Sequence, residues 1–188
     1  FMREAHESGV NMILTPLFTP PLDTEIGAER PTVQLVGVTK TNCGYTFDFS
    51  LLDRWVSLAE KSGITYFEMS HLFTQWGAKA APKIIATVNG RKKRIFGWDT
   101  PSDSEEYRSF LAALLPELCS HLKSLGIFGR TVFHISDEPS VEQIESYKAA
   151  KAIVKDILKD FPIIDALSEY DFYRDGVIEF PIPCTNHA

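Results

Sequence analysis

One stretch decides which fold the sequence predicts: Arg130-Thr131-Val132-Phe133-His134-Ile135-Ser136-Asp137-Glu138-Pro139-Ser140. Its first seven residues form a mostly apolar run of strand length, and Pro139 stops the strand because it has no amide to donate. Ser140 and Gln143 have the spacing of a capping box, which predicts a helix running to about Asp160. A strand followed directly by a helix is typical of a βα unit in a parallel sheet.

The same alternation continues on both sides of this stretch. Residues 1–9 predict a helix that leads into a strand at 10–15, and a helix capped by Ser50 leads through Gly63 into a strand at 64–69. A long helix is expected from Ser102–Ser104 to Gly126, with leucines at spacings of three and four and a bend or break at Pro116. The last strands are expected at 163–166 and 177–180.

Two further segment pairs predict antiparallel structure. Residues 33–38 and 45–49 can pair across the turn at 42–44, and residues 84–88 and 93–96 flank Asn89-Gly90, a strong hairpin signal. The second hairpin lies after a strand and before a helix, so we interpret it as an elaborated βα loop. Such loops often carry functional sites.

These elements predict about five parallel strands covered by helices. The fold expected is a partial (β/α)8 TIM-type barrel that lacks the first and last strands, because a complete barrel needs roughly 250 residues. Residues 1–188 then form a single incomplete domain of a larger protein. An open doubly wound sheet is the alternative, although no glycine-rich phosphate loop follows any expected strand.

Composition restricts the class of protein and its partners. A chain that is 44% hydrophobic and 23% charged is typical of a soluble globular protein, and its net charge of −6 argues against a nucleic-acid partner. The basic run at 91–94 is interpreted as a solvated hairpin tip. No apolar run is long enough to span a membrane, and residues 1–7 lack the apolar run of a signal peptide. A cytoplasmic location is predicted, with secretion as the alternative; the oligomeric state is left open.

The three cysteines, Cys43, Cys119 and Cys184, are odd in number and far apart. This spacing argues against a disulfide framework and against a paired-cysteine metal site. Cys119 falls on the apolar stripe of the long helix and is expected to be a small core residue.

Asp137 and Glu138 are the candidate catalytic residues. They lie at the carboxyl end of an expected strand, where parallel barrels carry their chemistry, although acids before a helix also simply favour its positive end. Ordinary glycosidases place two carboxyls roughly 5 to 9 Å apart across the bond that is cleaved, which adjacent residues do not suit. Adjacent acids suit another arrangement, in which one protonates the leaving oxygen and the other orients a nucleophile that belongs to the substrate.

Other polar and aromatic residues follow expected strands and are weaker candidates for substrate binding. They are Glu68, His71, Trp76, Asp171 and Tyr173, with Trp76 as a possible stacking platform for a sugar or a residue packed under the long loop. His134 is interpreted as a core histidine. No metal site or cofactor is expected, because the chain has no HExxH spacing, and no Ser-His-Asp or Cys-His signature stands out.

Three segments together resemble glycoside hydrolase family 123 and the related bacterial proteins known as domain of unknown function 4091. They are Asn11–Thr24 (NMILTPLFTPPLDT), Glu68–Gly77 (EMSHLFTQWG) and Ser136–Pro139 (SDEP), in the same order along most of the chain. The resemblance implies a (β/α)8 barrel and exo-acting β-N-acetylgalactosaminidase activity by substrate-assisted retention. It also implies that Asp137 orients the acetamido group and that Glu138 is the general acid/base.

The chain departs from the family pattern in what it lacks. The first strand, everything after roughly the sixth strand and the accessory β-domain are not expected here, so the fragment could be inactive. Two alternatives stay open. One is a non-catalytic carbohydrate-binding or scaffold domain, and the other is a glycosidase that needs no acetamido group.

Overall fold

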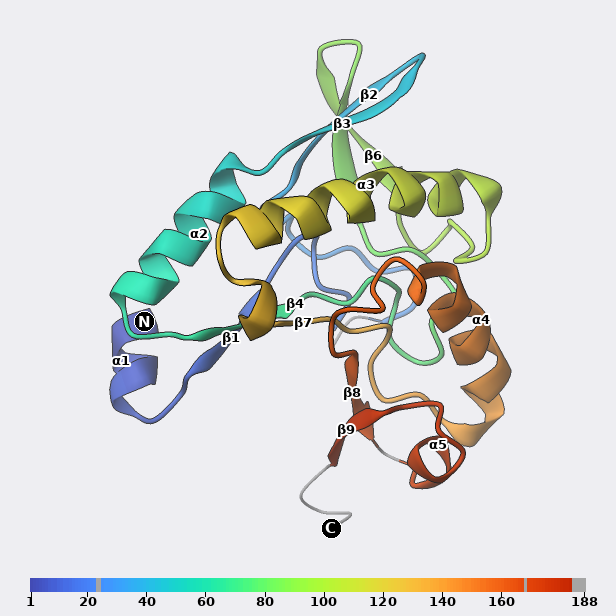
Figure 1. The fold of residues 1–188 in the computed structure, drawn as a ribbon. Helices are drawn as coiled ribbons and strands as arrows, with labels where there is room; N and C mark the ends of the chain where they lie inside the picture. Colours follow the sequence, from blue (N-terminus) through green and yellow to red (C-terminus); the bar gives the residue numbers. More distant parts are fainter. Residues whose placement is uncertain (23–24, 168, 184–188) are drawn as a thin grey trace.

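The computed structural model describes residues 1–22, 25–167 and 169–183, and within them the strands form three separate sheets. The first sheet is parallel, with the order β1 (Met12–Thr15), β4 (Tyr66–Met69) and β7 (Thr131–Val132). Met12 is opposite Tyr66, and Phe67 is opposite Thr131. These strands lie at the centre of the molecule, beneath α2 and α3 (Figure 1).

The second sheet has four strands in the order β3 (Gly44–Asp48), β2 (Gly37–Thr41), β5 (Ile84–Val88) and β6 (Arg91–Phe96). Its two hairpins project together at the top of Figure 1. Both predicted antiparallel pairs are present. The β5–β6 pair has the predicted strands, whereas β2 covers 37–41 instead of the predicted 33–38. The β5–β6 turn works as expected, because Asn89 and Gly90 both have positive φ, 50° and 74°. The basic run of residues 91–94 is exposed on this hairpin.

The third sheet is a parallel pair of β8 (Ile164–Leu167) and β9 (Phe180–Pro183), separated by the short helix α5 (Asp171–Arg174). This sheet lies at the bottom of Figure 1, near the C-terminus. A single parallel bridge between Phe133 and Ile163 connects it to the chain that follows β7.

The predicted partial (β/α)8 barrel is wrong. The described residues form sheets of three, four and two strands, and none of these sheets closes. The strand expected at 130–136 is reduced to the two residues of β7, because the amides of Ile135 and Ser136 donate to the side chain of Asp165 instead of to a neighbouring strand. A ladder that stops after two residues cannot extend the parallel sheet into a barrel wall.

The helices agree with the sequence patterns in position but differ at their ends. The structure has α1 (Met2–Glu7), α2 (Ser50–Lys61), α3 (Glu105–Ser124) and α4 (Ile144–Val154). Ser104 caps α3 through its side chain as expected, and α3 is continuous through Pro116, which lies on its exposed face. The predicted cap of α2 is different: Ser50 is the first helical residue, and Asp48 accepts its amide at 2.9 Å.

The capping box of Ser140 and Gln143 is present, but it opens a 3-10 turn, Val141–Gln143, ahead of α4. The helix then ends at Val154, six residues before the predicted end at Asp160. A second 3-10 turn, Phe128–Arg130, precedes β7. Gly63, after α2, has a φ of 91°, and a Cβ there would lie 2.4 Å from the ring of His6, so both conformation and space require glycine.

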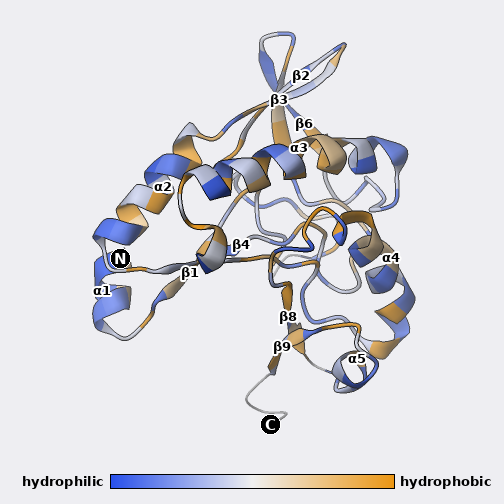
Figure 2. Cartoon of the chain, in the orientation of Figure 1, coloured by the Kyte–Doolittle hydropathy of each residue, from blue (hydrophilic) through white to orange (hydrophobic). Residues whose placement is uncertain are grey.

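The core lies between the helices and the sheets. In Figure 2, hydrophilic and hydrophobic segments alternate along α2, α3 and α4, as expected for helices with one buried face. Phe110 of α3 is fully buried at the centre of an aromatic cluster, with ring centroids 5.1 to 6.0 Å from those of Phe18, Tyr45, Phe47, Phe96 and Tyr107. This aromatic cluster joins α3 to the four-stranded sheet.

Within the described ranges, no helix has the length and apolar character needed to cross a membrane. Cys43 is an exposed free thiol, and Cys119 is a half-buried one. Burial raises the pKa of Cys119 to about 11. Cys184 lies outside the described residues, as do Asp23 and Thr24 of the first family-like segment.

Candidate functional site

Two loops run side by side where the parallel strands end at their carboxyl termini. The amides of Leu72 and Phe73, after β4, donate to the carbonyls of His134 and Ile135, after β7, at 3.3 and 3.0 Å. The same contact continues further along: Ser136 Oγ donates to the Thr74 carbonyl at 2.8 Å, and the Trp76 amide donates to the Asp137 carbonyl at 3.0 Å. The two predicted site segments, 68–77 and 136–139, are therefore brought together.

Asp137 and Glu138 lie at the end of this paired stretch. Asp137 is half-buried and Glu138 is exposed. Glu138 has a φ of 42°, a left-handed conformation that is uncommon for a residue with a side chain. Trp76 and Ala78 on the facing loop also have positive φ, 59° and 57°. Strained backbone of this kind is concentrated at functional sites, where surrounding contacts maintain it.

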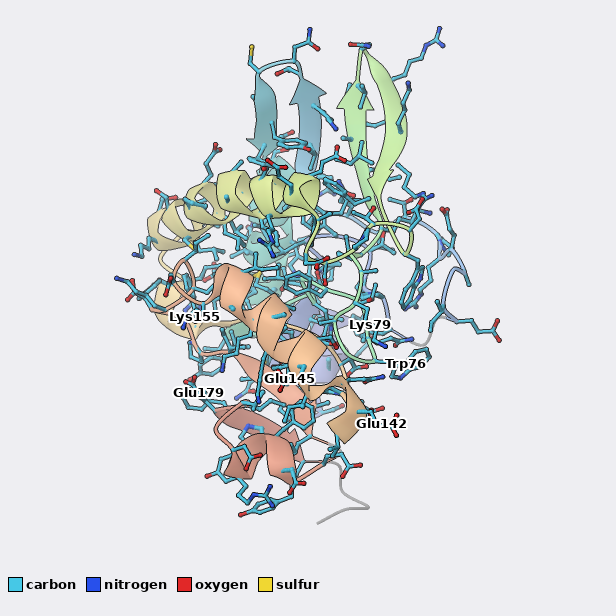
Figure 3. The ribbon with its side chains drawn as sticks, turned by 90° about the vertical axis from the view of Figure 1, so that its right-hand side faces the viewer. Trp76, Lys79, Glu142, Glu145, Lys155 and Glu179 are labelled. Carbon is cyan, nitrogen blue, oxygen red and sulfur yellow. The ribbon has the colours of Figure 1, made fainter. Side chains whose placement is uncertain are left out.

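Gly77 lets the Trp76 loop approach the start of the α4 region. Its φ is 98°, and a Cβ at this position would lie 2.7 Å from the side chain of Gln143. Figure 3 shows Trp76 and Lys79 on the same side of the molecule as Glu142, which precedes Gln143. The loop and the capping-box turn are thus packed closely, and a larger residue at 77 would separate them.

A polar cluster adjoins the paired loops, and we call it the His134 cluster: Glu68, His71, His134, Tyr147 and Asp165. All are buried except Glu68, which is half-buried. His134 Nε2 is 2.7 Å from Glu68 Oε1, and His134 Nδ1 is 3.1 Å from Asp165 Oδ1. Asp165 is completely buried and also accepts the hydroxyl of Tyr147. The interpretation of His134 as a core histidine is confirmed, since it is 3% exposed, and both of its nitrogens have carboxylate partners.

The two carboxylates keep His134 protonated. Burial alone lowers the pKa of His134, but the hydrogen bonds and charges of Asp165 and Glu68 outweigh it and raise the pKa to about 9. Burial also pushes the pKa of Asp165 upward, against the imidazolium and the donors that face it. Because His134, Ile135, Ser136 and Tyr147 all donate to this carboxylate, we assign Asp165 as ionised and His134 as an imidazolium.

His71 differs from His134 although the two rings lie 4.3 Å apart. Burial, and secondarily the charge of His134, lower the pKa of His71 well below its ordinary value, so it is neutral. Its Nδ1 is buried without a hydrogen-bond partner. Nitrogen and oxygen atoms of His71, His134 and Asp165 lie within 4.8 Å of one another, a spacing that a metal ion can use. With His134 protonated, its ring has no free lone pair, so a metal ion at this position would have to displace a proton from His134.

A cavity of about 200 Å³ adjoins the Trp76 loop, and two tryptophans, Trp76 and Trp98, line it. Gln75, Lys79 and Asp99 supply polar groups to its wall. A neighbouring cavity of about 300 Å³ shares Ile26, Thr74, Trp98 and Asp99 with it. Aromatic faces combined with a few polar groups form a surface suited to a sugar ring.

The family model for the catalytic domain of glycoside hydrolase family 123 matches residues 1–188. The chain belongs to glycoside hydrolase family 123. Membership in this family makes the chain a glycoside hydrolase domain whose expected ligand is a carbohydrate. None of the curated proteins compared with the chain matches it.

Not every candidate of this family 123 chain lies in the site just described. Asp171 of α5 forms an ion pair with Arg174 at 2.6 Å, and the exposed ring of Tyr173 lies 6.1 Å from that of Tyr170. Within the described part of the chain, neither residue is brought to the Asp137–Glu138 segment by these contacts. Their role in substrate binding stays a prediction.

Sequence reasoning missed three residues of the candidate site described above: Trp98, Tyr147 and Asp165. Asp165 is a charged residue in the middle of the apolar strand run 163–166. A charge in a buried strand usually needs a buried partner, and this pattern could have identified Asp165 from sequence. Trp98 follows the β5–β6 hairpin between a glycine and an aspartate, a position typical of an exposed loop aromatic. Tyr147 is indistinguishable in sequence from other members of the apolar stripe of α4.

Proposed function

We propose that this chain is an exo-acting β-N-acetylgalactosaminidase that works by substrate-assisted retention. The observation that carries the proposal is the adjacency of Asp137 and Glu138 in the loop that follows β7, with Glu138 in a left-handed conformation. Neighbouring acids are poorly suited to flanking a glycosidic bond from opposite sides. They are well suited to acting on two groups of one sugar residue, its acetamido group and its glycosidic oxygen.

In the proposed reaction, Asp137 accepts a hydrogen bond from the acetamido N–H and directs the carbonyl oxygen toward the anomeric carbon. As that oxygen forms its bond to carbon, the glycosidic C–O bond breaks and Glu138 donates its proton to the departing oxygen. The product is a bicyclic oxazoline, protonated on nitrogen, whose N–H stays hydrogen-bonded to the Asp137 carboxylate. Water then attacks the anomeric carbon, Glu138 takes a proton from that water, and the bond between the anomeric carbon and the acetamido oxygen breaks. Two inversions at the anomeric carbon give net retention.

The cavity beside the Trp76 loop is the proposed place for the sugar ring. Its volume of about 200 Å³ accommodates a single sugar residue, which suits an exo-acting enzyme. Trp76 and Trp98 offer apolar faces for the C–H surface of the sugar, and Gln75, Lys79 and Asp99 offer polar atoms for its hydroxyls. The Trp76 amide bonds the Asp137 carbonyl, so this cavity wall is tied to the proposed catalytic pair.

The first experiment measures hydrolysis of three nitrophenyl glycosides: β-N-acetylgalactosaminide, β-N-acetylglucosaminide and β-galactoside. The proposal predicts turnover of the acetamido sugars, with the galacto form preferred, and none of the plain galactoside. Equal hydrolysis of the plain galactoside would instead indicate a glycosidase that needs no acetamido group.

The second experiment compares Glu138→Gln with Glu142→Gln, a change of the same type at an exposed neighbour. Loss of the general acid is expected to lower kcat by about 10² to 10⁴-fold, while the Glu142 variant keeps wild-type rates. Sugar binding with no turnover by the wild type, unchanged in Glu138→Gln, would indicate a non-catalytic carbohydrate-binding domain.

The third experiment tests substrate assistance directly. A thiazoline analogue of the proposed oxazoline is expected to inhibit competitively, and Asp137→Asn is expected to weaken that inhibition, because the amide no longer provides a negative charge opposite the ring nitrogen. A hydrolase that ignores both the analogue and the substitution does not use the acetamido group as its nucleophile.

A further inference from the structure

Asp165 of β8 is a fully buried carboxylate surrounded by four hydrogen-bond donors. Oδ1 accepts from His134 Nδ1 at 3.1 Å and from the Ser136 amide at 3.3 Å. Oδ2 accepts from the Ile135 amide at 3.3 Å and from the hydroxyl of Tyr147. Three of the four donors belong to the consecutive residues 134–136, which lead directly into Asp137 and Glu138.

This carboxylate replaces the strand that would normally hold such a segment. The backbone of Phe133 still pairs with Pro162 and Ile164, at 3.0 and 2.9 Å. From Ile135 onward, a side chain accepts the amides on this side, and the Leu72–Trp76 loop bonds the segment on its other side. Residues 134–137 are therefore fixed from two directions, and the charge of Asp165 provides one of them.

We propose that Asp165 is a positioning residue for the catalytic pair, holding the backbone of Ile135 and Ser136 so that Asp137 and Glu138 keep their reactive geometry. The inference rests on the proposed function, because it assigns Asp165 a role in that reaction. Asp165 touches no substrate; it acts through residues 134–136. Tyr147 and His134 are its supports, since each donates one hydrogen bond to the same carboxylate.

The hold of Asp165 on residues 134–136 depends on the protonation state of His134 as well as on the geometry of the donors. The charged or titratable groups that face His134 are Glu68 from β4, Asp165 from β8 and His71 from the loop after β4, and Tyr147 from α4 faces it through Asp165. A doubly protonated His134 donates to both carboxylates at once. A neutral His134 has one donor, so one carboxylate loses its partner above about pH 9, where the raised pKa of His134 places this change.

The test substitutes Asp165→Asn, which keeps the size of the side chain but removes its charge and gives it a donating NH₂ where donors already point. Asp156→Asn, at an exposed position on the segment after α4, is the matched control. The backbone amide NMR signals of Asp137 and Glu138 and the imidazole ¹⁵N shifts of His134 are followed, together with kcat and KM on the nitrophenyl β-N-acetylgalactosaminide.

The expected result for Asp165→Asn is a fall in kcat of about 100-fold with KM changed less than about threefold. Both amide signals shift, and His134 loses its proton at lower pH than in the wild type, which moves the alkaline limb of the kcat profile in the same direction. Asp156→Asn leaves all of these unchanged. A folded Asp165→Asn chain with unmoved amide signals and wild-type kcat overturns the proposal.

Two further comparisons keep the outcome decisive. If Asp165→Asn does not fold, Tyr147→Phe removes one donor and leaves the carboxylate, and the same amide signals must shift, or the proposal is overturned. If the wild-type chain shows no turnover on any acetamido sugar, the proposed function fails. The amide and imidazole signals then still decide whether Asp165 positions the segment.

Discussion

Two regions of this protein lie close together, and one consists of apolar rings whereas the other consists of charged and polar side chains. The aromatic cluster around Phe110 consists of ring faces and edges between α3 and the four-stranded sheet. The His134 cluster consists of two carboxylates, two imidazoles and a phenol at the carboxyl end of the parallel strands. Phe110 is 0% exposed and His134 is 3% exposed, so burial does not distinguish the two regions.

The difference lies in what burial costs each region. Apolar rings gain free energy when they leave water, and they gain it in any orientation that fills space. Charged groups lose hydration when they are buried, and they regain it only where donors face acceptors. The aromatic cluster is therefore expected to contribute stability that is independent of pH. The His134 cluster is expected to contribute less net stability, but to fix the directions of the residues it holds.

The largest expected effect is that of Phe110→Ala, which removes the centre of the aromatic cluster. The cost is about 3 to 5 kcal/mol of unfolding free energy, the usual range for a buried phenylalanine, and it is the same at pH 6 and pH 9. Denaturant unfolding at the two pH values measures it, with Phe1→Ala as the control, since Phe1 is 86% exposed. If the loss of unfolding free energy in Phe110→Ala changed with pH, the aromatic cluster would not differ from the His134 cluster in the way stated.

The next effect is that of His134→Gln, which removes a titrating group. The pKa of His134 is raised in the folded chain to about 9 from an ordinary 6.5. Its contribution to stability is therefore fully present below pH 6.5 and is lost as the pH rises through 9. The shift corresponds to about 3 kcal/mol.

Stability measured at pH 6, 7.5 and 9.5 should fall with pH in the wild type and change less in His134→Gln. His6→Gln, at an exposed histidine, should follow the wild type. A wild-type chain whose stability is constant across this window would contradict the assignment of His134 as an imidazolium.

The buried face of α3 and the two hairpins could be predicted from sequence because their signals are local. The residues Asn89-Gly90 are enough to predict the β5–β6 turn, and the spacing of the leucines is enough to predict which face of α3 is buried. That the three-stranded parallel sheet stays open could not be predicted in this way. β7 is two residues long because Asp165, 29 and 30 residues further along the chain, accepts the amides that an adjacent strand would have bonded.

The candidate site also has features that local sequence predicts and features that it does not. Asp137 and Glu138 stood out because they are adjacent and follow a strand. The convergence of Glu68, His134 and Asp165 joins three separate strands or their ends, and no single stretch of sequence contains it. The family resemblance supplied the roles of the two acids, since residue spacing alone does not separate a catalytic pair from acids that favour a helix start.

A smaller effect is expected from His71→Leu, and it sharpens the contrast within the His134 cluster. Burial lowers the pKa of His71 well below its ordinary value, so its contribution to stability is present above about pH 6.5 and is lost as the pH falls. Removing the group should reduce the loss of stability between pH 6.5 and 5 by at most about 2 kcal/mol, since one proton corresponds to about 1.4 kcal/mol per pH unit. Acid unfolding that is identical in the wild type and the variant would show that His71 is not buried neutral.

The smallest effect tests whether the two regions are coupled through Tyr107, which is linked to His134 by way of Leu72. Tyr107 stacks beside Phe110 in the aromatic cluster, and its buried hydroxyl donates to the Leu72 carbonyl. The amide of Leu72 in turn donates to the His134 carbonyl. Tyr107→Phe should cost about 1 kcal/mol, because it leaves that carbonyl without its donor, and Tyr170→Phe, at a 65% exposed residue, should cost nothing measurable.

The cost of Tyr107→Phe should not depend on pH, since burial raises the pKa of this phenol far above the range in which the His134 cluster titrates. The double variant Tyr107→Phe/His134→Gln then measures the coupling. An interaction energy of about 0.5 kcal/mol or more means that the aromatic cluster helps to hold the site loop. Strict additivity, measured at pH 6 where the His134 contribution is fully present, would mean that the two regions stabilise the chain independently.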